Sequence, residues 1–167
     1  MNYSPRGFSL IEGLIVFFVI ALIGSLSALA VNTARAKSRD AVRLSHVREV
    51  QSALEQVFNE VNSYPKGEAL PLGDPSIASC LAAEGFAGDC RGSASIILPR
   101  VFSTIEDGLS GIVSCGTPLR NAFCYTQTEN GRSYRIQFEL ERDLIPANLA
   151  AGVVCASPDG MVAGSCR

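Results

Sequence analysis

The chain has 167 residues, enough for one modest domain and one further element. Its net charge of −2 argues against the basic footprint of a nucleic-acid-binding protein. It has six cysteines but no Cys-x-x-Cys pair, which argues against zinc ribbons and thioredoxin-like redox sites.

The first predicted element is an apolar helix close to the N-terminus. Residues 13–31 are 19 residues without a charge, and at about 1.5 Å per residue they nearly span a hydrocarbon core. Extending this segment back to Phe8 gives 24 residues with one charge, that of Glu12. An ionisable group in such a segment costs roughly 2.5–3.5 kcal/mol, so we expect Glu12 to have a function and a partner.

Two ordinary interpretations of this segment each leave something unexplained. In a secretory signal peptide, Arg6 would supply the basic region and Ala28-Leu29-Ala30 the cleavage pattern, but the apolar run is too long for one. A plain single-pass anchor without processing leaves Glu12 without a role.

The hexapeptide Gly7-Phe8-Ser9-Leu10-Ile11-Glu12, behind a short leader with Arg6 and before an apolar run, resembles the class III signal of type IV pilins and pseudopilins. The resemblance implies that a prepilin peptidase cuts between Gly7 and Phe8 and then methylates the new N-terminus at Phe8. Residues 1–7 would be the leader, and Glu12 would be the family's signature glutamate at mature position five. The apolar helix would survive processing.

The resemblance also implies a partner for Glu12. Its carboxylate would pair with the Phe8 ammonium of a neighbouring subunit in the filament, because two unpaired charges in low dielectric are each costly. The pair would set the register between subunits. The alternative is that Glu12 reaches the membrane interface at the start of the helix, where an acid suits the helix dipole.

The charges that flank the apolar helix conflict with export of the C-terminal part. The leader has only Arg6, whereas Arg35, Lys37, Arg39 and Arg43 follow the helix, and the positive-inside rule would keep the basic side in the cytoplasm. The cysteines and the class III signal favour export instead. This basic cluster could contact lipid headgroups or an acidic partner, or form a solvated helix face.

The helix is predicted to continue beyond the membrane to about Asn62. Apolar residues recur at spacings of three and four, and no proline or glycine interrupts residues 25–63. They are Val47, Val50, Leu54, Val57, Phe58 and Val61. The predicted domains are therefore the leader 1–7, the transmembrane or filament-core helix 8–31, its amphipathic continuation 32–63 and a head at 64–167. Resemblance to the pilin family is dense over residues 6–67 and thin beyond.

The head is rich in turn signals, and two hairpins are predicted in it. Strands at 123–128 and 133–141 flank an Asn-Gly turn, and the second strand alternates apolar with polar residues. A second hairpin is predicted through 153–155 and 161–162, and a short helix at 77–84. The fold class is therefore α+β, with a small antiparallel sheet of three or four strands on the C-terminal half of the helix. This is the pilin-like ladle.

Six cysteines without metal spacing indicate three disulfides in an oxidising compartment. Six cysteines allow 15 pairings, and the sequence does not choose among them. The working prediction joins nearest neighbours: Cys80–Cys90, Cys115–Cys124 and Cys155–Cys166. The alternative is six reduced cysteines packed in a cytoplasmic core.

No catalytic constellation is present in the sequence, and the chain is predicted not to be an enzyme. The one histidine, His46, lies among charges on the helix and is predicted to be solvated. Four acids near the C-terminus could bind calcium, as such loops do in major pseudopilins, but turn capping and a solvated strand face also explain them. They are Glu139, Glu141, Asp143 and Asp159. No other cofactor is expected.

The resemblance therefore implies a structural subunit of a type IV pilus or related pseudopilus, first a single-pass membrane protein with an extracytoplasmic head. Its expected partners are copies of itself, other pilin-like subunits, prepilin peptidase, an inner-membrane assembly platform and, before assembly, lipid. The head has 8 basic and 11 acidic residues, a charge of −3, which disfavours nucleic acid. The alternative is a membrane-anchored or secreted disulfide-rich binding module that forms no filaments.

Overall fold

The computed structural model describes residues 10–166, except for the side chain of Leu29. The chain divides between Arg35 and Ala36 into two units. One long α-helix comes first, and antiparallel sheets and two short 3-10 helices follow it in the second unit, so the α+β class is confirmed.

Helix α1 (Leu10–Val61) has 52 residues. It stops where the chain takes the left-handed conformation at Asn62, which has a φ of 56°. The N–H of Asn62 donates to the carbonyl of Phe58 at 2.7 Å, and Pro65 lies three residues on. Asparagine tolerates this conformation after a helix, so the predicted end near Asn62 is confirmed.

Within residues 10–166 the strands form three sheets, all antiparallel. The five-stranded sheet has the order β1 (Leu70–Leu72), β7 (Phe123–Thr128), β8 (Ser133–Leu140), β9 (Gly152–Ser157) and β10 (Gly160–Ala163). The three-stranded sheet has the order β3 (Gly85–Ala87), β2 (Cys80–Ala82) and β4 (Ile96–Leu98), and β5 (Ser114–Cys115) pairs with β6 (Arg120–Asn121). The 3-10 helices are η1 (Glu129–Gly131) and η2 (Ile145–Ala147).

Both predicted hairpins are confirmed, although the sheet has five strands where three or four were predicted. Strands β7 and β8 are joined through η1, and β9 and β10 meet at the pair Ser157 and Gly160. Gly131, in the first turn, has a φ of 90°, and a Cβ there would clash with the side chain of Ser63. Only glycine fits this close approach of the turn to the end of α1.

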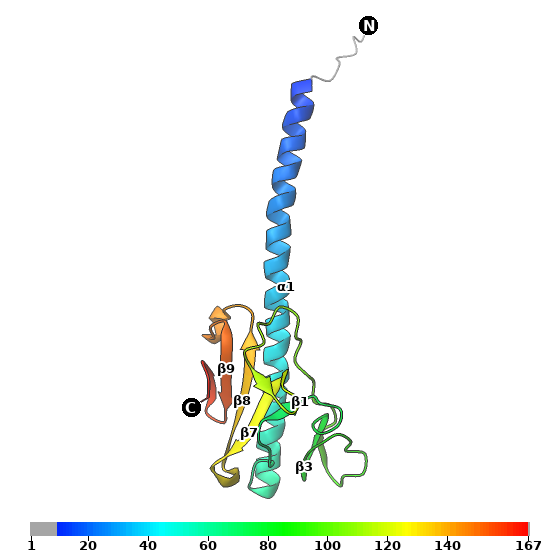
Figure 1. Ribbon diagram of the computed structural model, residues 1–167, viewed down its shortest axis with the longest axis vertical. Coiled ribbons are helices and arrows are strands. Elements are labelled where there is room, and N and C mark those ends of the chain that lie inside the picture. Colours follow the sequence, from blue (N-terminus) through cyan, green and yellow to red (C-terminus); the bar gives the residue numbers. More distant parts are fainter. Residues whose placement is uncertain (1–9, 167) are drawn as a thin grey trace. The chain divides into compact units, whose positions relative to one another are not determined.

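The core of the C-terminal unit lies between α1 and the five-stranded sheet, and Figure 1 shows β7, β8 and β9 beside this part of the helix. Val47, Val50, Leu54 and Val57 are buried on the helix, as the predicted stripe requires, whereas Val61 at its end is half exposed. The four apolar residues of β8 that alternate with polar ones are buried against it. They are Tyr134, Ile136, Phe138 and Leu140.

The short helix predicted at 77–84 is wrong. The carboxylate of Asp74 does accept the N–H of Ser76 at 2.7 Å, but the turn that follows leads into β2. Strand β2 pairs with β3 and β4 on either side, and the bond from Cys80 to Cys90 closes this hairpin. Strand pairing and a covalent link have here outweighed a local helix signal.

Candidate functional site

The N-terminal part of α1 presents a continuous apolar surface. Its large apolar side chains are exposed, and the helix is long and apolar enough to cross a membrane. They are Leu10, Ile11, Leu14, Ile15, Val16, Phe17, Phe18, Val19, Ile20, Leu22, Ile23, Leu26 and Val31. A contiguous apolar surface of this kind is a site of interaction with a membrane or another protein.

Glu12 lies in the first turn of α1 and is exposed. Within residues 10–166 its carboxylate has neither an ion-pair partner nor a hydrogen-bond partner. The proposed cleavage residues Gly7 and Phe8 lie outside the described residues. The Glu12 carboxylate is thus an acceptor on an otherwise apolar surface, available to a group from outside this part of the chain.

Two serines within the apolar surface have their hydroxyls satisfied by the helix itself. Ser25 donates to the carbonyl of Leu22 at 2.9 Å, and Ser27 donates to that of Ile23 at 2.8 Å. Such bonds to the preceding turn leave no hydroxyl proton that needs a partner outside the helix. These serines therefore do not interrupt the apolar character of the surface.

Within the second unit, a cluster of charges ties the end of β8 to the part of α1 that belongs to this unit. Arg43 is fully buried, and its Nη1 lies 2.7 Å from carboxylate oxygens of both Asp40 and Glu141. Arg39 donates from Nε and Nη2 to the two oxygens of Glu141, each at 2.7 Å. The bond from Arg39, followed by that from Arg43, lowers the pKa of Glu141 to about 2. Glu141 therefore stays ionised in all but strong acid.

The charge cluster continues into the irregular segment at residues 105–112, which we call the 105–112 loop. Arg43 donates to the carbonyls of Ile105 at 2.9 Å and Asp107 at 2.6 Å. Glu139, which is buried, accepts the N–H groups of Ser110 at 2.6 Å and Ile112 at 3.0 Å. Arg43 and Glu139 thus supply hydrogen-bond partners for the backbone of this loop, as a neighbouring strand does in a sheet.

These contacts correct two predictions. Arg39 and Arg43 do not form a solvated helix face, because both are ion-paired, and Glu139 and Glu141 do not lie on a solvated strand face. The spacing of Asp40 and Arg43 by three residues is an ion-pair pattern on a helix, and it could have signalled part of the cluster. Nothing local to β8 shows that Glu139 binds a loop about 30 residues earlier in the chain.

The prediction that His46 is solvated is also wrong. Its ring stacks on that of Phe102, with centroids 4.4 Å apart, and meets Phe123 edge-on at 6.5 Å. Its Nδ1 is buried without a hydrogen-bond partner in the described part of the chain. Burial lowers the pKa of His46, and the weaker field of Glu49 raises it. His46 is therefore a half-buried residue that packs against two aromatic rings.

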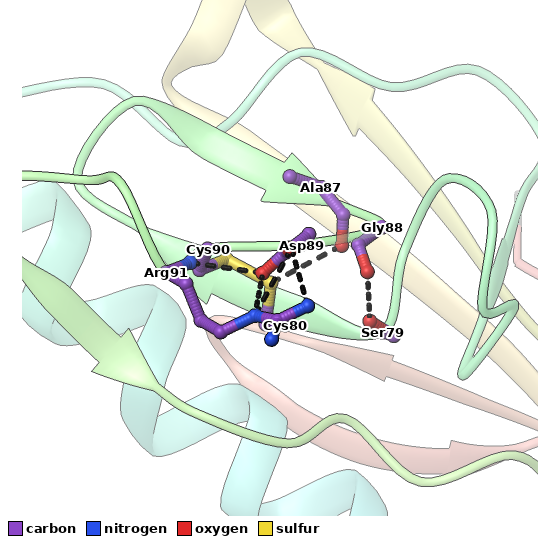
Figure 2. Close-up of a disulfide and its surroundings, with 7 residues drawn as sticks. All are labelled: Ser79, Cys80, Ala87, Gly88, Asp89, Cys90 and Arg91. Atoms are coloured by element: carbon purple, nitrogen blue, oxygen red, sulfur yellow. Dashed lines mark hydrogen bonds and ion pairs between the residues drawn. A yellow bond between two sulfur atoms is a disulfide. The ribbon is translucent and has the colours of Figure 1, made fainter.

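Three disulfides stabilise the second unit, and they are the same three pairs as in the nearest-neighbour prediction. They join Cys80 to Cys90, Cys115 to Cys124 and Cys155 to Cys166. Figure 2 shows the first of them, with the hydroxyl of Ser79 donating to the carbonyl of Gly88 at 2.7 Å beside it. Asp89 and Arg91 form an exposed ion pair at 2.9 Å on the same hairpin.

The four acids considered for calcium are not gathered into one site. Asp143 accepts the N–H of Ala151 at 2.7 Å, Asp159 is exposed in the turn between β9 and β10, and the other two belong to the contacts above. Among the described residues, no three or more histidine, cysteine or acidic side chains are placed to hold a metal ion.

No family model, curated protein or solved structure matches this chain. The residues of this chain and their geometry therefore supply what is known of its function. Two features bear on function: an exposed apolar helix segment with one carboxylate, and a second unit whose loops are joined by three disulfides and by buried charges.

Proposed function

We propose that this chain is a structural subunit of a type IV pilus or related pseudopilus, which polymerises through the N-terminal part of α1. Prepilin peptidase removes residues 1–7, and the pilin-like head, exported before assembly, stays outside the cytoplasm. The observation that carries the proposal is the exposed apolar surface of α1 with the unpaired carboxylate of Glu12 in its first turn. A lone carboxylate there needs a cation, and cleavage before Phe8 would supply one on each copy.

The second unit is suited to be carried on a filament. Three disulfides tie its loops to one another, and the buried charge cluster ties Glu141 to Arg43 of α1. Helix contacts repeated from copy to copy, without closure, give an open polymer. Lipid covers the apolar surface before assembly, and neighbouring helices cover it afterwards.

The mass of the mature N-terminus tests the processing step. We expect the mature chain to begin at Phe8 and to carry a methyl group, as measured by mass spectrometry of the intact protein. A mature chain that begins at Val31 would instead identify a secreted binding module with a cleaved signal peptide. A chain that retains Met1 would identify a plain membrane anchor.

The substitution Glu12→Ala tests the assembly step. Cleavage and membrane insertion should be unchanged, because both depend on other residues, while sheared filaments should fall at least tenfold, about 1.4 kcal/mol. Ser9→Ala, in the same hexapeptide, is the matched control and should assemble normally. Normal filaments from Glu12→Ala would remove Glu12 from the mechanism.

A further inference from the structure

Beyond the helix contacts, the second unit has two surfaces of complementary character. The first is the 105–112 loop. Glu106 is exposed and has no ion-pair partner in the described part of the chain, and the Asp107 side chain is 77% exposed although it reaches Arg39 at 3.2 Å. Ile112, at the end of the loop, is 61% exposed. The loop thus presents acids and an aliphatic side chain on a backbone that Arg43 and Glu139 hold in place.

The second surface is a groove of about 450 Å³ between α1 and η2, which we call the α1–η2 groove. Its lining is mostly apolar with one cation: Ala41, Leu44, Ser45, Arg48, Leu144, Pro146 and Ala147. Lys37 lies on the same side of α1, one turn before Ala41. In the described residues neither Lys37 nor Arg48 has an ion-pair partner, so both cations are free to meet acids from another molecule.

The two surfaces lie on opposite sides of α1. Arg39 contacts the 105–112 loop and His46 packs on Phe102 just before it, whereas Ala41 and Arg48 line the groove. Ala41 follows Arg39 by two residues, and Arg48 follows His46 by two. Two residues turn a helix by about 200°, so each pair points in nearly opposite directions.

We propose that the 105–112 loop of one copy docks in the α1–η2 groove of the next copy. This inference rests on the proposed function and names a second contact within the same filament. Glu106 pairs with Arg48 or Lys37 of the neighbour, and Ile112 covers the apolar lining beside Leu144. Because the surfaces differ and lie on opposite sides of the helix, each copy offers both, and the contact extends without closing.

Zero-length cross-linking of the assembled protein tests this contact directly. The sequence has only two lysines, Lys37 and Lys66, so a carbodiimide has few amines to join to a carboxylate. We expect a Glu106–Lys37 cross-linked peptide, and filaments grown from mixed isotope-labelled and unlabelled chains should show it between copies. Cross-links of Glu106 only to Lys66, or only within one copy, would overturn the contact.

A charge exchange provides the second test. Glu106→Arg and Arg48→Glu should each lower the yield of sheared filaments at least tenfold, about 1.4 kcal/mol, and the double variant should recover most of it. Glu84→Lys, an exposed reversal on the turn between β2 and β3, is the matched control and should assemble normally.

The outcomes separate this inference from the proposed function. If the wild type forms filaments and both reversals behave like Glu84→Lys, the docking contact is overturned while the helix-based polymer stands. If the wild type forms no polymer in cells that process it, the proposed function fails and the docking contact fails with it. Recovery by the exchange, together with the Glu106–Lys37 cross-link, supports the contact.

Discussion

At the scale of single residues, the structure depends on buried charges that serve as backbone partners. Arg43 reaches two carbonyls of the 105–112 loop, and Asp40 accepts the N–H groups of Glu141 at 3.0 Å and Arg142 at 2.9 Å. A buried ion pair adds little net stability, but removal of one member leaves the other charge uncompensated. Substitution of one member of this cluster should therefore lower the free energy of unfolding far more than substitution of an exposed charge.

Arg43→Met should lower the free energy of unfolding by about 3–5 kcal/mol, because it leaves the buried carboxylate of Asp40 without a cation to pair with. Urea unfolding of the full chain in detergent micelles, followed by tyrosine fluorescence, measures the change. Arg132→Met, at an exposed position after η1, is the control and should stay within about 0.5 kcal/mol of the wild type. An equal response of the two variants would mean that the charge cluster is not what holds the loop.

His46 should make stability depend on pH near neutrality. Its pKa is lowered in the native state, so the unfolded chain binds a proton first as the pH falls. The free energy of unfolding should be constant above the ordinary pKa of 6.5, fall below it, and level off below the native pKa. Urea midpoints between pH 5 and 8 measure this.

His46→Phe is the matched variant for that measurement, because it keeps the stacking on Phe102 and removes the titration. His46 is the one histidine of the chain, so the slope below pH 6.5 should disappear. A slope that persists in His46→Phe would assign it to another group.

At the scale of elements, short strands are stabilised by short disulfide loops. Strands β2 and β3 have three residues each, and the bond from Cys80 to Cys90 spans a separation of 10 residues. A two-stranded hairpin of this length would be marginal by itself, and β4 adds only one further strand of three residues. The covalent link therefore adds order to what this short strand pairing supplies.

The double variant Cys80→Ala with Cys90→Ala should lose about 2–3 kcal/mol of unfolding free energy, from the chain entropy of a loop of about ten residues. Hydrogen exchange should locate the loss in residues 80–98 and leave β7 and β8 protected. Glu84→Ala, at an exposed position within the same loop, serves as the control. Unchanged protection of β2 would show that pairing and packing alone hold the hairpin.

At the scale of the whole molecule, the two units differ in how far their apolar side chains are buried. The second unit has a core of buried apolar side chains, whereas the large apolar side chains described in the first unit are exposed. We expect a membrane or other helices to cover them. The apolar part of α1 should therefore hold the full chain in the membrane fraction. Alkaline extraction, which releases peripheral proteins, should leave it there.

Ile20→Arg should weaken this retention, because an arginine near the middle of a spanning helix costs about 2.5–3.5 kcal/mol. The fraction of chain released by alkaline extraction measures the effect. Ser38→Arg, on the exposed helix beyond the apolar part, is the control and should remain in the membrane. Equal retention of the two variants would contradict a spanning role for residues 10–31.

Much of this architecture follows from local pattern. The helix, its end at Asn62, the buried stripe and both hairpins are each encoded by residues close together in the chain, through period, turn residues and capping. The same is true of the apolar surface and of Glu12 on it. These features need no knowledge of distant contacts, which is why the sequence alone predicts them.

Tertiary structure alone decided the features that join distant segments. The turn that replaced the helix at 77–84, the burial of Glu139 and the stacking of His46 all depend on partners 10 to 56 residues away. An acidic residue on a strand that alternates apolar and polar residues shows the same local sequence pattern whether its carboxylate is bound by water or by the backbone of a loop. Only the folded chain brings that loop to the strand, and so only the structure distinguishes a solvated charge from a buried one.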